Sequence, residues 1–181
     1  MKKLFVVLAF GFSVVASYGQ GTVTFANASA TAITNISVPA PYPKAAVTVG
    51  LYGSTLLSLP DDSSLVLIGV IGNTFTPGLF SLGSRSIGNP GDTVTLQVRA
   101  WSGAFANYAL AFAAAQVDGT TLTGKSTKWE QVTGGGTNPA QPITGAGRLT
   151  PFTVNTAVPE PSSIALGLLG LGAIAMFRRR K

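Results

Sequence analysis

The stretch that most clearly predicts the fold lies near the middle of the chain and reads Asn89-Pro90-Gly91-Asp92-Thr93-Val94-Thr95-Leu96-Gln97-Val98-Arg99-Ala100-Trp101. Its first four residues form a turn signal, because proline fixes one backbone angle and glycine accepts a positive φ. Apolar and polar residues then alternate, which predicts a β-strand. One face of this strand is apolar, from Val94 to Ala100, and the other is polar and ends in Arg99 and Trp101.

Further segments predict strands on both sides of this one. Residues 22–26 and 46–52 alternate in the same way, and residues 128–133 and 149–155 are further candidates. The continuous apolar run 65–71 predicts a strand that is buried on both faces. Several short strands separated by turns that contain glycine and proline favour a mainly β domain, an antiparallel β-sandwich.

Residues 104–116 depart from this pattern. They are rich in alanine, contain neither proline nor glycine, and place Phe105, Tyr108 and Phe112 at helical spacing. Alanine is the strongest helix former, so we expect one short helix packed across the end of the sheets. A further strand is the alternative.

The composition excludes several kinds of active site. The chain has 181 residues, no histidine and no cysteine, and only 10 % of its residues are charged. No Ser-His-Asp or Cys-His catalytic site, no Cys/His zinc or iron–sulfur site and no disulfide can be built without these residue types. We therefore expect neither a metal nor a cofactor.

The net charge of +6 resides at the two ends of the chain. Lys2 and Lys3 at the start and the cluster 178–181 at the end supply the whole excess, and the residues between them hold six basic and six acidic side chains. These six basic residues are scattered singly in the sequence, whereas a phosphate backbone needs them clustered. We therefore expect no nucleic-acid partner.

The N-terminus has the three parts of a secretory signal peptide. Two lysines precede the apolar run 4–16, and small and polar residues follow it. Cleavage after Gly19 would place Ser17 and Gly19 at the −3 and −1 positions, and cleavage after Ala16 is the alternative. The run is short for an uncleaved anchor, since a membrane span needs about 20 residues. We assign residues 1–19 to a signal peptide, which implies the translocon and signal peptidase as partners.

The C-terminus ends in an apolar segment followed by a basic cluster. Residues 162–177 are apolar apart from two serines, and the cluster is Arg178-Arg179-Arg180-Lys181. A helix rises about 1.5 Å per residue, so this segment is slightly short for a hydrocarbon core of roughly 30 Å, and snorkelling arginines extend it. We expect a transmembrane helix at 162–177. The basic cluster would stop transfer on the cytoplasmic side of the inner membrane and leave residues 20–157 as an exported domain.

The residues around this segment carry a family resemblance. Val158-Pro159-Glu160-Pro161-Ser162-Ser163, a glycine-rich apolar stretch and an arginine-rich end together resemble the PEP-CTERM protein-sorting signal over residues 158–181. The resemblance implies recognition by exosortase, a membrane enzyme of bacteria that make extracellular polysaccharide. It assigns the recognition motif to Pro159, Glu160 and Pro161, with processing at or near them. Residues 21–27 and 97–101 resemble the exported domains of such precursors, a likeness that brings no catalytic residue.

The acidic residues of the exported domain are its candidates for catalysis: Asp61, Asp62, Asp92, Asp118 and Glu130. A glycosidase needs two carboxyl groups about 5–10 Å apart. Asp61 and Asp62 are adjacent, and successive side chains of an extended chain point in opposite directions. Their surroundings predict a turn, and Asp92 and Asp118 have the setting of local caps. A calcium site would need a spaced acidic loop, which the sequence lacks.

Three aromatic residues are candidates for a sugar-binding surface: Trp101, Tyr108 and Trp129. Aromatic faces contact the CH groups of pyranoses, and an indole N–H can donate a hydrogen bond. Trp101 falls on the polar face of its predicted strand, which favours exposure. We favour packing of these residues in the core or between the sheets, and the sugar-binding surface is the alternative.

We therefore predict an exported, non-enzymatic protein of the bacterial cell surface or extracellular biofilm matrix. Its C-terminal helix would hold it in the inner membrane until an exosortase-like enzyme processes it. The alternative is a carbohydrate-binding module for extracellular polysaccharide, and a third hypothesis is a secreted hydrolase that uses two carboxylates.

Overall fold

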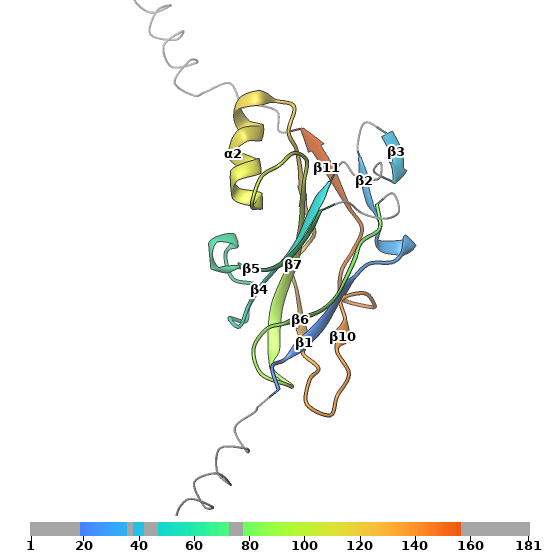
Figure 1. The fold of residues 1–181 in the computed structure, drawn as a ribbon, viewed down its shortest axis with the longest axis vertical. Coiled ribbons are helices and arrows are strands. Elements are labelled where there is room, and N and C mark those ends of the chain that lie inside the picture. Colours follow the sequence, from blue (N-terminus) through green and yellow to red (C-terminus); the bar gives the residue numbers. More distant parts are fainter. Residues whose placement is uncertain (1–18, 36–37, 42–46, 73–77, 157–181) are drawn as a thin grey trace, which may run out of the picture.

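The structure, a computed structural model, describes residues 19–35, 38–41, 47–72 and 78–156 (Figure 1). The predicted signal peptide and the predicted transmembrane helix therefore lie outside the described residues. The described part is mainly β with one α-helix, as the sequence predicts, and it also contains two short 3-10 turns. In chain order its elements are β1 (Thr22–Ala26), η1 (Ser29–Thr31), β2 (Ile33–Asn35), β3 (Val38–Pro41), β4 (Thr48–Ser54), η2 (Asp62–Ser64), β5 (Val66–Gly72), β6 (Ser81–Ser86), β7 (Thr93–Trp101), α2 (Tyr108–Asp118), β8 (Leu122–Lys125), β9 (Trp129–Val132), β10 (Gln141–Pro142) and β11 (Phe152–Thr156).

The strands form two sheets. The smaller sheet has the order β10-β1-β6, and the larger has the order β3-β2-β11-β8-β7-β4-β5, with β9 also paired to β7. Most neighbours are antiparallel, but β1 with β10 and β11 with β2 are parallel pairs. The expectation of a wholly antiparallel arrangement is therefore wrong at these two places, where strands far apart in the sequence are brought together.

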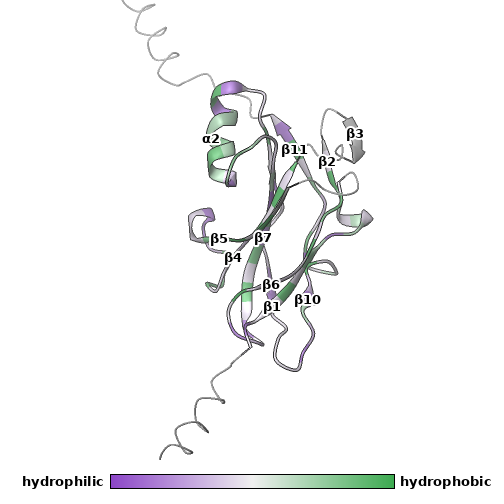
Figure 2. Ribbon diagram, in the orientation of Figure 1, coloured by the Kyte–Doolittle hydropathy of each residue, from purple (hydrophilic) through white to green (hydrophobic). Residues whose placement is uncertain are grey.

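The strand β7 organises the larger sheet (Figure 1). It pairs with β4 along one edge, and with β9 and then β8 along the other. The apolar face predicted from its alternation is confirmed, because Val94, Leu96, Val98 and Ala100 are fully buried. They pack in a core that also contains Val23 and Phe25 of β1, so this core joins the two sheets (Figure 2).

The opposite face of β7 is buried as well, which the sequence did not predict. Thr95 and Trp101 are fully buried on this face, and Arg99 is only 6 % exposed. A second cluster, made of Tyr52, Leu65, Trp101, Tyr108 and Ala111, covers it. Apart from Trp101 of β7 itself, these residues come from β4, from the connection before β5 and from α2. The helix and that connection therefore shield the end of β7 from solvent.

The prediction that the apolar run 65–71 forms a strand buried on both faces is wrong. This run forms β5, which pairs only with β4 at the edge of the larger sheet. Val66 is 70 % exposed and Val70 is 42 % exposed. The strands buried on both faces are β4 and β7, because the core between the sheets covers one face and the second cluster covers part of the other. An apolar run alone does not distinguish these two positions.

The predicted helix is present but is shifted toward the C-terminus. It begins after Asn107, whose side chain accepts a hydrogen bond of 3.0 Å from the backbone N–H of Leu110. It ends at Gly119, which adopts the left-handed conformation with φ of 61°. An asparagine N-cap and a glycine C′ residue are common boundaries of helices. Among the described residues, no helix is long and apolar enough to cross a membrane.

Candidate functional site

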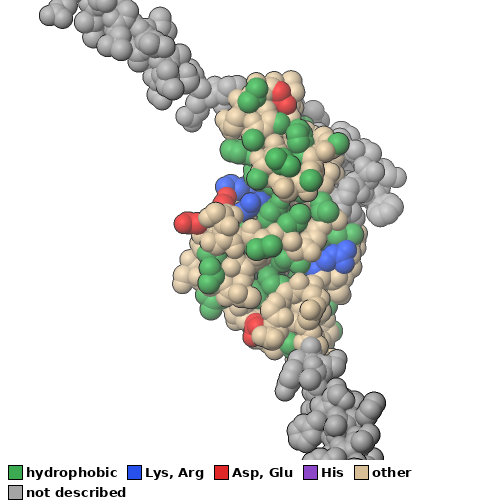
Figure 3. All heavy atoms as spheres, turned by 60° about the vertical axis from the view of Figure 1, so that its left-hand side comes forward, with side chains coloured by type: hydrophobic (Ala, Val, Ile, Leu, Met, Phe, Trp, Pro, Cys, Tyr) green, Lys and Arg blue, Asp and Glu red, His purple; other side chains and the backbone are tan. Residues whose placement is uncertain are grey.

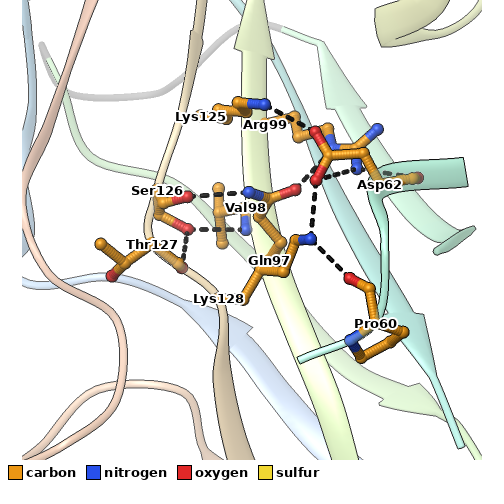
Figure 4. A network of polar contacts seen from close by, with 9 residues as sticks. All are labelled: Pro60, Asp62, Gln97, Val98, Arg99, Lys125, Ser126, Thr127 and Lys128. Carbon is orange, nitrogen blue, oxygen red and sulfur yellow. Dashed lines mark hydrogen bonds and ion pairs between the residues drawn. The ribbon is translucent and has the colours of Figure 1, made fainter. Parts of the chain in front are cut away.

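Three basic side chains surround the carboxylate of Asp62 (Figure 4). The Nζ of Lys125 lies 2.6 Å from one carboxylate oxygen, and the Nζ of Lys128 lies 2.9 Å from the other. The Nη2 of Arg99 lies 3.8 Å from that second oxygen and donates a hydrogen bond of 3.2 Å to the backbone carbonyl of Asp62. We call these four residues the Asp62 cluster.

Strand pairing brings the basic residues of this cluster together. Arg99 of β7 and Lys125 of β8 are directly opposite in antiparallel register. Like charges that face each other across a strand pair destabilise it. The η2 turn places Asp62 against both, so the carboxylate offsets this repulsion. Lys128 follows β8 and also donates a hydrogen bond to the carbonyl of Pro60, which holds the η2 connection to the sheet.

The guanidinium of Arg99 is packed between aromatic rings. Its central carbon lies 4.4 Å from the ring centre of Tyr52 and 5.4 Å from that of Tyr108. Its Nε donates a hydrogen bond of 2.8 Å to the side-chain oxygen of Gln97, whose amide nitrogen donates to the carbonyl of Ser126. Cation–π contacts and these hydrogen bonds fix the orientation of a charged group that is largely removed from water.

One nitrogen of Arg99 has no hydrogen-bond partner within the described residues. The bonds of Nε and Nη2 leave Nη1 without one. In the same part of the chain, the only fully buried side-chain nitrogen or oxygen without a partner is Nε2 of Gln131. Because Nη1 of Arg99 is not among the fully buried atoms without a partner, it is accessible to solvent. Arg99 lines an open groove.

This groove lies between η2 and α2. It has a volume of about 290 Å³ and is lined by Asp62, Ser63, Arg99, Tyr108, Ala109, Phe112 and Lys125. A second hollow lined by Asn107, Ala109, Ser63 and Arg99 adjoins it. Figure 3 shows basic and acidic side chains gathered on this face beside the apolar surface of the helix.

The apolar wall of the groove is a pair of stacked rings. Phe112 and Tyr108 lie one helical turn apart on α2, with ring centres 5.9 Å apart and an angle of 18° between their planes. Phe112 is 44 % exposed, whereas burial leaves Tyr108 only 8 % exposed. Burial also raises the pKa of the Tyr108 hydroxyl. The groove thus combines an exposed aromatic face with cations.

The surrounding cations keep Asp62 ionised. Partial burial by itself would raise the pKa of this carboxyl. The hydrogen bonds from Lys125 and Lys128 and the charges of Lys125 and Arg99 outweigh that effect, so its pKa falls to about 2. One carboxylate thus faces three cations, and the cluster keeps an excess of positive charge. The neighbouring Asp61 is exposed and does not line the groove.

The predicted sugar-stacking residues do not form an exposed surface. Trp101 is fully buried, and its Nε1 donates to the carbonyl of Phe105 at 3.0 Å. Trp129 is 4 % exposed in the core between the sheets, where its Nε1 donates to the side chain of Gln131 at 2.8 Å. Tyr108 packs edge-on against Trp101. The favoured prediction of packing is confirmed, because Trp129 lies in the core between the sheets and Trp101 and Tyr108 lie in the second cluster.

Three other acidic side chains have separate partners: Asp92 and Asp118 bind neighbouring residues, and Glu130 binds a distant segment of the chain. Asp92 accepts hydrogen bonds from the backbone and side chain of Asn89 within its turn. Asp118 accepts three bonds from Thr120 and Thr121, and those from Thr121 chiefly lower its pKa to about 2. The predicted local roles of both are confirmed. Glu130 accepts a bond of 2.7 Å from the backbone N–H of Ser58.

The Asp62 cluster was not predicted from the sequence. The six basic residues between the charged ends of the chain are scattered singly in the sequence, yet three of them converge on Asp62 in the structure. The nearest sequence signal is the pair Lys125 and Lys128 beside a predicted strand, but the pairing of β8 with β7 was not predicted. The turn predicted at Asp61 and Asp62 is confirmed as η2. In the described ranges, no group of three His, Cys, Asp or Glu residues could hold a metal ion.

The comparison with known families concerns the C-terminus. A family model described as the PEP-CTERM protein-sorting motif matches residues 157–181. The chain carries the PEP-CTERM sorting signal. Pro159, Glu160 and Pro161, together with the basic cluster 178–181, fall within the match, all beyond the described residues. The PEP-CTERM signal marks an exported protein that exosortase-type machinery handles at the membrane. No curated protein and no solved structure matches the chain.

Proposed function

We propose that this PEP-CTERM protein is a non-enzymatic component of the cell surface or extracellular matrix. The match to the sorting motif at residues 157–181 is the observation that carries the proposal. The signal-peptide pattern of residues 1–19 at the other end of the chain supports it. Residues 20–157 are the cargo, and the two ends direct its transport.

Each end has a separate role in this transport. Residues 1–19 direct the chain to the translocon and are removed by signal peptidase. Residues 162–177 then halt transfer in the inner membrane, with the basic cluster 178–181 on the cytoplasmic side. The motif Pro159-Glu160-Pro161 is held at the outer surface of that membrane, where an exosortase-like enzyme cuts near it. The cut releases the domain or transfers it to the surface.

The geometry of the last strand is compatible with such a cut. β11 ends at Thr156, and the sorting motif begins at the next residue. This strand lies within the larger sheet between β2 and β8, and its Val154 is fully buried. Cleavage near Pro159 removes no residue of the described core. We regard the exported domain as a β-sandwich, because its two sheets enclose one shared core.

The arrangement of the acidic residues supports a non-enzymatic role. Asp62 is paired with cations, Asp92 and Asp118 cap turns, and Glu130 binds a backbone N–H. A carboxylate pair for hydrolysis needs two groups that converge on one substrate bond. Four acidic residues with separate partners give little support to the hydrolase hypothesis.

The intact mass of the exported protein, compared between membrane and extracellular fractions of the native host, tests this proposal. We expect an extracellular form that lacks the first 19 residues and the tail beyond about Val158. The variant Glu160→Ala should retain the tail and remain in the membrane fraction, whereas Ser163→Ala is the matched control. An extracellular form that still contains residues 164–181, or normal processing of Glu160→Ala, would overturn the proposal.

Carbohydrate binding is a second candidate function of the exported domain. The predicted platform of Trp101, Tyr108 and Trp129 does not support it, because these residues are buried. The groove beside α2 supports it instead, since it presents an exposed phenylalanine face next to cations.

A further inference from the structure

The Asp62 cluster has a net positive charge, because it contains three cations and one carboxylate. Asp62 neutralises one of the three cations that face it. Lys125 remains 49 % exposed at its side chain, so it can reach a ligand in the groove. The Nη1 of Arg99 is unpaired within the described residues and lies on a side chain that is nine-tenths buried. A buried guanidinium with an open N–H is suited to bind an anion of fixed geometry.

The groove also favours a ligand with a flat apolar face. Phe112 is 44 % exposed and is held in place by its stack on Tyr108. A sugar ring presents CH groups on one face, and these pack on an aromatic ring. Ser63 on the opposite wall can exchange hydrogen bonds with ring hydroxyls. A simple inorganic anion would use the cations and leave the aromatic wall unused.

We propose that the groove between α2 and η2 binds a carboxylate-bearing sugar ring, such as a uronic acid unit of an acidic polysaccharide. The carboxylate binds Nη1 of Arg99 and Nζ of Lys125, and the ring lies against Phe112. The inference deepens the carbohydrate-binding candidate by giving it a site and a ligand class. It does not rest on exosortase processing, so its failure would leave the sorting proposal standing.

A purely structural role of the cluster makes a different prediction. If the cations serve only to hold η2 on the sheet, removing Asp62 weakens the fold and creates no affinity for anions. If the groove is an anion site, Asp62 repels the bound carboxylate at close range. The variant Asp62→Asn should then bind the ligand about threefold more tightly, whereas Lys125→Gln should bind it more weakly. Opposite effects at two residues of one ion pair are not expected from loss of structure.

Calorimetric titration of the protein in the form that its host produces, purified in a non-ionic detergent where the form is membrane-bound, tests the site. The probes are a hexamer of galacturonate, a neutral hexamer of glucose and inorganic sulfate. We expect the galacturonate hexamer to bind, its affinity to fall with added salt, and the other two probes to bind at least tenfold more weakly. Lys125→Gln and Phe112→Ala should each weaken binding about three- to tenfold.

Two variants serve as matched controls. Arg85→Gln removes a cation of β6 that lies outside the cluster, and Val117→Ala trims an 86 % exposed residue of the same helix that does not line the groove. Both should bind as the unmodified chain does, and unfolding curves verify that each variant is folded. The proposal is wrong if the uronate does not bind, if the neutral hexamer or sulfate binds equally well, or if Arg85→Gln weakens binding as much as Lys125→Gln.

Discussion

The hydroxyl of Tyr52 accepts a hydrogen bond of 2.9 Å from the backbone N–H of Tyr108, the first residue of α2. The same Tyr52 ring lies 4.4 Å from the guanidinium carbon of Arg99. One side chain of β4 thus satisfies a backbone N–H at the start of the helix and also supports the buried cation. The N–H groups of a first helical turn have no partner within the helix, so this bond fixes the position of α2 on the sheet.

Replacing Tyr52 should separate these two contributions. Tyr52→Phe keeps the ring under Arg99 and removes the bond to the helix, so we expect it to lower the free energy of unfolding by about 1 kcal/mol. Tyr52→Ala also opens a cavity and should cost about 3 kcal/mol or more. Denaturant unfolding measures both values. Equal losses in the two variants would show that the ring contributes nothing.

The pKa of Asp62 predicts how the cluster responds to acid. Its value of about 2 in the folded state lies below the ordinary value of 3.8. Stability from this group is therefore fully present above the ordinary value and is lost as the pH falls through 2. Asp118 should also contribute a loss of stability as the pH falls from its ordinary pKa of 3.8 toward 2, because its pKa in the folded protein is also about 2.

Thermal unfolding between pH 5 and pH 2 should therefore show a shallower loss of stability for Asp62→Asn than for the unmodified chain. Asp118→Asn is the comparison variant, and the double variant should be the least sensitive to pH. An unchanged slope in Asp62→Asn would mean that its carboxylate is not held by the three cations.

The burial of both tryptophans predicts the fluorescence of the folded protein. The chain has only two, Trp101 and Trp129, and they are fully buried and 4 % exposed. We expect an emission spectrum that is blue-shifted relative to tryptophan in water, and little quenching by iodide until the protein unfolds. Strong quenching of the native protein would show that a ring is exposed and would restore the stacking platform predicted from the sequence.

A close backbone contact predicts that Gly124 does not tolerate a side chain. Gly124 lies in β8 between β7 and β11, and a Cβ atom there would come within 2.2 Å of the carbonyl oxygen of Thr153. We expect Gly124→Ala to lower the free energy of unfolding by about 1–3 kcal/mol, because the strands must separate. Thr153→Ala, which leaves the carbonyl in place, should have a small effect by itself and should not rescue Gly124→Ala. If Thr153→Ala restored the stability of Gly124→Ala, the added Cβ atom would clash with the Thr153 side chain and not with its carbonyl oxygen.

Features encoded by neighbouring residues could be predicted from the sequence. The turn signal Asn89-Pro90-Gly91-Asp92 and the alternation after it correctly predicted β7 and its apolar face, because both depend on local backbone preferences and period. The alanine-rich segment predicted α2 for the same reason, although its first residue came later than expected. The sequence did not predict β2, β3, β6, β8 and β10. Four of these strands are only two to four residues long, too short for a period to be visible, and the six-residue β6 has Leu82 as its one apolar side chain.

The sequence by itself determined the mainly β class, the short helix of the described residues and the sorting signal at residues 157–181, since each is a linear pattern of neighbouring residues. Only the tertiary structure decided which strands are buried on both faces and which cations meet. Lys125 and Asp62 are 63 residues apart in the chain. Their contact depends on the register of β7 with β8 and on where η2 lies on the sheet. Both follow from burying apolar area between distant segments, a gain in free energy that no single stretch of the chain contains.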